Sequence, residues 1–130
     1  MTAVADTSPL VILTKLGCLD FLNRVFPLVY ISNEVHYEVV VAGAGLPGAS
    51  EVSKAEWIEV KSIQNPGGLL SAQRKYGLGP GEMSAISLAK ELGANPVLLD
   101  DTRRANWRRQ RALKSLGASA CLKPFTYGGI

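Results

Sequence analysis

The stretch from residue 79 to residue 101 constrains the fold most, because it reads as one helix followed directly by one buried strand. Pro80 suits the first helical position, where its missing N–H costs nothing, and Gly93 suits the residue just past the end. The apolar run 97–99 has no polar alternation, which is typical of a strand buried on both faces of a parallel sheet. The stretch therefore predicts an α/β domain.

Two adjacent carboxylates, Asp100 and Asp101, follow that strand. In open α/β sheets ligands bind in the crevice beyond the carboxyl ends of the strands. The pair is therefore a candidate metal or phosphate site. Glu82 falls in the first turn of the preceding helix, where the helix dipole favours a carboxylate.

The rest of the chain repeats this alternation of strand and helix. Ser8 is the expected N-cap of a short helix that begins with Pro9, and either Ser32 or Asn33 is the expected cap of a helix of about ten residues. Predicted strands cover residues 2–5, 28–31, 57–61 and 97–99, and predicted helices cover 9–16, 19–26, about 33–43, a short segment through 55, 69–76, 80–92 and 102–114. With 130 residues, this order predicts one three-layer α/β/α domain with a mostly parallel central sheet.

The charge of the chain is uneven along its length. Residues 1–100 carry seven Lys/Arg against ten Asp/Glu, whereas residues 101–130 carry seven Lys/Arg against one Asp. The basic end suits a polyanion, an acidic protein partner or a solvated helix face. Two cysteines without metal-ligand spacing, and no apolar run long enough to span a membrane, favour a cytoplasmic protein with no membrane partner.

Acidic residues recur where the predicted elements meet. They are Asp6 after the first strand, Glu38 in the helix after the second, Glu82 and one of the Asp100–Asp101 pair. Carboxylates that share a site raise one another's pKa, and a hard divalent cation with oxygen ligands resolves that conflict. The pattern therefore favours Mg²⁺ or Mn²⁺, although Asp6 also suits a helix cap and Glu38 an ordinary surface position.

Five ordered blocks of sequence resemble the PIN domain, in particular predicted nucleic-acid-binding proteins related to VapC-type toxins. The blocks are Val4-Ala-Asp6-Thr-Ser-Pro-Leu, Lys15-Leu-Gly17-Cys-Leu-Asp20, Ile31 through Glu38-Val39, Leu78-Gly-Pro-Gly81-Glu82 with Ala85-Ile86-x-Leu88-Ala89, and Leu98-Leu99-Asp100-Asp101. The resemblance implies a Mg²⁺- or Mn²⁺-dependent endoribonuclease, usually the toxin of a prokaryotic toxin–antitoxin pair and often a homodimer. RNA and a cognate antitoxin protein are the partners it implies.

The resemblance also assigns roles to residues. Asp6, Glu38, Glu82 and the Asp100–Asp101 pair would form the catalytic, metal-binding set. Thr7 or Ser8 would sit beside Asp6 and orient it or a water. After the acidic pair, Arg103, Arg104 and Arg108 could contact RNA phosphates or grip an acidic antitoxin.

Beyond about residue 105 the sequence departs from the family pattern, with Asn106 in place of an expected arginine. We therefore expect an atypical or truncated C-terminal part within a single domain of residues 1–130. The residues are also compatible with two other functions. One is a non-catalytic PIN-like module that binds RNA or protein, and the other is a receiver-like phosphoryl-transfer domain, which would lack a lysine opposite its acids.

Overall fold

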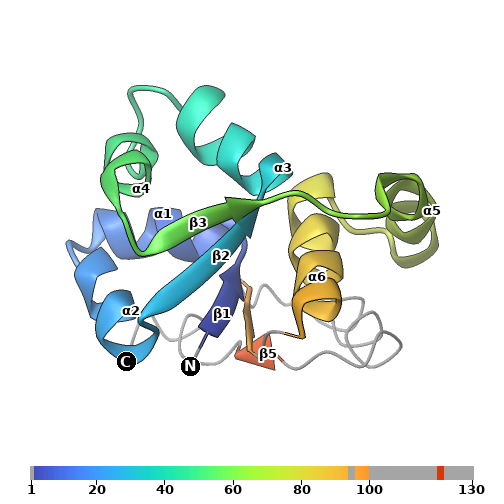
Figure 1. Cartoon of the computed structure of the whole chain (residues 1–130). Coiled ribbons are helices and arrows are strands. Elements are labelled where there is room, and N and C mark those ends of the chain that lie inside the picture. The colour runs from blue at the N-terminus through green and yellow to red at the C-terminus, as the bar shows by residue number, and fades with distance from the viewer. Residues whose placement is uncertain (1, 94–95, 100–119, 122–130) are drawn as a thin grey trace.

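The computed structural model describes residues 2–93, 96–99 and 120–121 (Figure 1). Strands and helices alternate along the chain, as the sequence predicts. In order they are β1 (Thr2–Ala5), α1 (Thr7–Lys15), α2 (Leu19–Val25), β2 (Leu28–Ser32), α3 (Asn33–His36), the π-helix η1 (Tyr37–Val41), α4 (Ala49–Lys54), β3 (Ile58–Lys61), α5 (Pro66–Tyr76), α6 (Pro80–Leu92), β4 (Val97–Leu98) and β5 (Ala120–Cys121).

The strands form one sheet in the order β3-β2-β1-β4-β5, and every neighbouring pair is parallel. β1 lies at the centre, where Val4 pairs with Tyr30 of β2 on one side and Val97 of β4 on the other. Because all strands run the same way, their carboxyl ends lie at one edge of the sheet. Asp6, which follows β1, therefore lies at the edge where such folds bind ligands.

Two separate cores show that helices cover both faces of the sheet. Ala3 and Ala5 of β1 pack in a cluster with residues from α1, α2, α3 and α4. Val4, which points the other way between them, packs in a second cluster with residues from α5 and α6. Alternation along a strand sends successive side chains to opposite faces, so the three-layer α/β/α prediction is confirmed.

The boundaries of α6 follow the sequence signals. Pro80 occupies its first turn, and Gly93 at the C-cap has φ of 63°, the left-handed conformation that glycine adopts without strain. Its apolar face is narrower than expected, because Leu92 is 41% exposed whereas Ile86, Leu88 and Ala89 are buried.

Two local predictions were wrong. The N-cap of α1 is Asp6 and not Ser8, because the Asp6 carboxylate accepts the Thr7 N–H and the helix begins at Thr7. Pro9 is still tolerated there, since the first N–H groups of a helix have no intrahelical acceptor. The alternation of apolar and polar residues over 57–61 predicts a half-exposed strand with one buried face, but in β3 only Ile58 is buried and Val60 is 42% exposed. The position of β3 as the outermost strand of the sheet explains this exposure.

No helix in the described part of the chain is long and apolar enough to cross a membrane. The predicted basic helix 102–114 lies outside the described residues. Near the C-terminus, Ala120 and Cys121 extend the sheet by pairing with Val97 and Leu98.

Candidate metal centre

Asp6 is the buried anchor of the site. Its side chain is 3% exposed, and its Oδ1 accepts a 2.7 Å hydrogen bond from the Thr7 N–H. Its own backbone N–H donates to the Leu98 carbonyl at 3.0 Å, which fixes the residue beside the end of β4. The two roles open for Asp6 are compatible, because the cap bond uses Oδ1 and a carboxylate has further lone pairs for a ligand.

Glu38 approaches Asp6 from the helix that follows β2. The Thr7 hydroxyl donates to Glu38 Oε2 at 3.3 Å, so one residue contacts both carboxylates, Asp6 through its N–H and Glu38 through its side chain. Glu38 belongs to η1, where α3 widens into a π-helical turn. Such turns are rare and occur frequently at functional sites.

The two carboxylates meet at Gly81 in the first turn of α6. A Cβ at this position would overlap Glu38 Oε1, and it would lie 3.0 Å from Glu38 Cδ and 3.2 Å from Asp6 Oδ1. The absence of a side chain at Gly81 thus lets both acids approach the start of α6. The positive end of the α6 dipole lies at this start and favours negative charge.

A buried chain of hydroxyls holds the start of α6 against α3. Ser84 Oγ donates to the Gly81 carbonyl at 2.8 Å and lies 2.7 Å from Ser32 Oγ. Ser32 Oγ in turn accepts the Val35 N–H at 3.1 Å and caps α3. Since the Ser84 hydrogen is used on Gly81, Ser32 must be the donor between the two hydroxyls. Both hydroxyl hydrogens of Ser32 and Ser84 have an acceptor. The network therefore fixes Gly81 relative to the helix that leads to Glu38.

The surroundings of Glu38 disfavour the ionised form of its carboxyl group. Partial burial raises the pKa of Glu38 above its ordinary value of 4.5, and the Thr7 hydrogen bond acts in the opposite direction. The negative charges of Glu82 and Glu34 also raise the pKa of this carboxyl. A cation placed among these groups would remove that penalty.

The donor set fits a hard divalent ion. Asp6 and Glu38 offer carboxylate oxygens, Glu82 lies in the first turn of α6, and Mg²⁺ is usually held by one or two carboxylates with waters completing its shell. Within residues 2–93, 96–99 and 120–121, no three His, Cys, Asp or Glu side chains are grouped closely enough to hold a metal by themselves. Asp100 and Asp101 lie outside these residues.

Of the other predicted site residues, some lie in the described part of the chain and some lie outside it. The Thr7 N–H contacts Asp6, and its hydroxyl donates to Glu38 and not to Asp6. Ser8 lies in α1, and its hydroxyl makes no hydrogen bond to the described residues. The arginines expected to contact RNA, Arg103, Arg104 and Arg108, lie outside the described residues.

Sequence reasoning missed the part that Gly81, Ser84 and Ser32 play at this site. Gly81 carried a usable signal, because glycine inside the first turn of a helix lowers helix propensity and needs another reason to be there. Ser84 in the middle of an otherwise apolar helix face was a second signal, since a buried hydroxyl needs a partner.

Comparison with known families gives a match. A family model described as a PIN domain matches residues 2–123. The comparison with curated proteins found no match. PIN domains are generally nucleases and typically use divalent metals. Because the match spans most of the 130 residues and the parallel sheet with helices on both faces agrees with it, the chain belongs to the PIN-domain family.

Proposed function

We propose that this protein is a metal-dependent endoribonuclease, resembling the toxin of a toxin–antitoxin pair, that hydrolyses RNA phosphodiesters. The observation that supports this proposal best is the convergence of Asp6 and Glu38 on Gly81 in a PIN domain. Two carboxylates at the carboxyl edge of a parallel sheet, with a side-chain-free helix start between them, suit an ion that must also meet a phosphate.

Asp6, Glu38 and Glu82, together with Asp100 or Asp101, would hold Mg²⁺ or Mn²⁺. The chemistry that such an ion supplies is activation of water for attack on a phosphodiester and neutralisation of charge on the phosphate. Asp6 is positioned by its cap bond and by β4, so it acts as the rigid ligand. Glu38 is held by the Thr7 hydroxyl and stays partly solvated, so it can adjust when ion and substrate arrive.

The α6 start contributes a further selective feature. Its dipole favours an anion at the same place where the carboxylates favour a cation. A phosphate oxygen beside Gly81 would therefore be attracted both by the backbone and by an ion held on Asp6 and Glu38. A neutral substrate gains neither attraction.

Partners follow as part of the same proposal. Arg103, Arg104 and Arg108 are placed by the sequence just after the acidic pair, where they can neutralise RNA phosphates. We also propose that the protein binds a cognate antitoxin protein and forms a homodimer.

The test uses the whole chain and a labelled RNA of mixed sequence, incubated with Mn²⁺ or Mg²⁺, with EDTA, and with the Asp6→Asn variant. Asparagine caps a helix as well as aspartate does, so this variant should keep the fold, which circular dichroism checks. We expect cleavage that requires the metal and is lost in the variant. Absence of cleavage by a folded, metal-loaded chain would contradict the proposal and favour a non-catalytic RNA- or protein-binding module.

A further inference from the structure

A cavity of about 430 Å³ lies at the edge of the sheet opposite the acidic site. Trp57, on its wall, directly precedes β3, whereas Asp6 directly follows β1. Because the strands are parallel, Trp57 lies at the amino ends of the strands and Asp6 lies at their carboxyl ends. The cavity therefore does not belong to the candidate metal centre. Its size is in the range of small-ligand sites.

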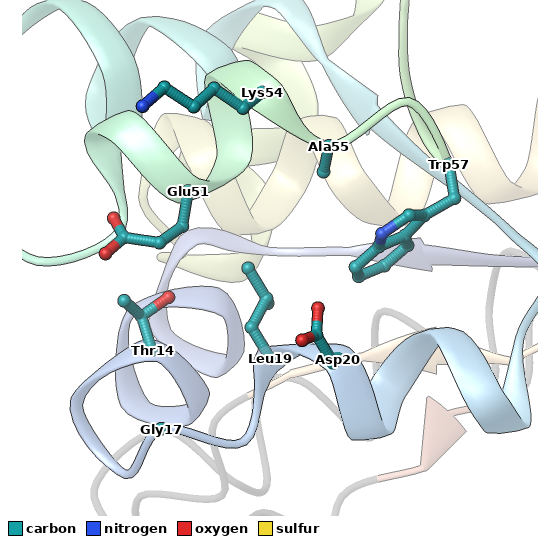
Figure 2. A pocket seen from close by; sticks show the side chains of 8 residues that line it. All are labelled: Thr14, Gly17, Leu19, Asp20, Glu51, Lys54, Ala55 and Trp57. Carbon is teal, nitrogen blue, oxygen red and sulfur yellow. The ribbon is translucent and has the colours of Figure 1, made fainter.

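The walls combine apolar surface with an aromatic ring. Leu19 is a buried wall residue, Ala55 is half-buried, and Trp57 is half-buried against the core. Figure 2 shows the Trp57 indole and the Asp20 carboxylate pointing toward one another across the cavity. Within the part of the chain that the structure describes, neither the indole N–H nor the Asp20 carboxylate has a hydrogen-bond partner.

The charges around the cavity favour a cation. Asp20 and Glu51 supply two carboxylates, and α1 ends beside them, so its carbonyl end adds partial negative charge. Lys54 is the basic residue among the lining residues, and Figure 2 shows its side chain extending away from Trp57 and Asp20. A nucleic-acid phosphate would be repelled from the carboxylates.

We propose that this cavity binds an arginine side chain of a polypeptide partner. A guanidinium is planar, so it can stack on the indole and donate two parallel hydrogen bonds to Asp20, whereas an ammonium can do neither as well. Cation–π contact adds further attraction when the cation is desolvated. This binding does not depend on nuclease activity.

Two exposed apolar residues that adjoin the lining residues in sequence favour a polypeptide over a free small molecule. Leu16 precedes the lining residue Gly17, and Phe21 follows Asp20. Their side chains are 53% and 60% exposed, respectively. Exposed apolar side chains next in sequence to Gly17 and Asp20 offer surface for the residues that flank an inserted arginine in a polypeptide.

The proposal can be tested by NMR on the ¹⁵N-labelled full chain, following the Trp57 indole N–H, which the Trp57→Phe variant assigns. The probes are acetyl-Leu-Ala-Arg-Ala-Leu-amide, its citrulline counterpart, acetyl-arginine-amide and oligouridylate. Citrulline keeps the shape of arginine without its charge. We expect the arginine peptide to bind at least about tenfold more tightly than the citrulline peptide, as loss of a charge-assisted contact predicts.

Two variants localise the contact. Asp20→Asn should weaken the arginine peptide by about tenfold, whereas Glu59→Gln, which removes an exposed carboxylate of β3 outside the cavity, should leave its affinity unchanged. Equal binding of the arginine and citrulline peptides, or no effect of Asp20→Asn, would overturn the proposal. Acetyl-arginine-amide binding as tightly as the peptide would overturn the polypeptide source, and oligouridylate shifting the same signal would replace the proposal with a nucleic-acid subsite.

Discussion

Replacing Gly81 with alanine inserts one methyl group between the two acids of the candidate metal centre. The new Cβ would overlap Glu38 Oε1 and lie 3.2 Å from Asp6 Oδ1. The Glu38 oxygen would have to retreat by more than about 1 Å to reach an ordinary contact distance. Because this oxygen is the far end of a flexible side chain, it can move at little cost to the stability of the fold. The same movement displaces a ligand of the candidate metal centre.

The effect on stability should be small, because two contributions oppose one another. Alanine is better than glycine in a helix by up to about 1 kcal/mol. Loss of the Thr7–Glu38 hydrogen bond costs about the same. We expect a net change within about 1 kcal/mol, or about 4 °C in Tm for a chain of this length. A ligand displaced by about 1 Å can reduce catalysis about 100-fold, so activity should fall far more than stability.

The assay compares Gly81→Ala with Gly79→Ala, whose added Cβ would meet no atom within 4 Å. Both glycines belong to the start of α6, and the backbone of Gly79 is extended and open to any residue. Mn²⁺ affinity, RNA cleavage and Tm are measured on each. The reasoning predicts that only Gly81→Ala loses affinity and cleavage. Unchanged metal binding and cleavage in Gly81→Ala would refute it.

Three further predictions follow from the same contacts. Ser84→Ala should lower the free energy of unfolding in urea by about 1–3 kcal/mol, because Ser32 Oγ loses its buried acceptor; an unchanged midpoint would count against the network. Thr7→Val should weaken Mn²⁺ binding severalfold while Thr7→Ser restores it, as calorimetry can measure, and equal effects would show that the hydroxyl is not used. Because burial raises the pKa of Glu38, the ionised group costs stability, and stability should fall as pH rises past 4.5. Metal-free Glu38→Gln should therefore melt above the wild type at pH 7 and match it near about pH 4, and a gap that is independent of pH would contradict this.

Much of the fold could be predicted because its signals are local. Pro80 and Gly93 bound α6 as expected, and the unbroken apolar run after it forms the buried β4. The error at Ser8 has a tertiary cause. Asp6 is held extended by its bond to Leu98, and its carboxylate then takes the first free N–H of α1 before Ser8 can act.

The acids of the site could be proposed from their places where the predicted strands and helices meet, but their arrangement could not. The π-helical turn that carries Glu38 departs from the 3.6-residue period. The direction of the Glu38 side chain therefore could not be predicted from the spacing of residues in the sequence. The role of Gly81 depends on side chains that are distant in sequence, Asp6 and Glu38. Such a contact exists only after β1, η1 and α6 have packed together.

Calorimetric titration of the metal-free chain with Mn²⁺ tests the central claim most directly. The wild type should bind Mn²⁺, and Asp6→Asn and Glu38→Gln should each weaken that binding by at least about tenfold through loss of a charged ligand. Glu51→Gln, at the opposite edge of the sheet, removes the same charge and should bind as the wild type does. If all four proteins bind Mn²⁺ equally, or if Glu51→Gln loses as much as the other two, Asp6 and Glu38 do not form the metal centre.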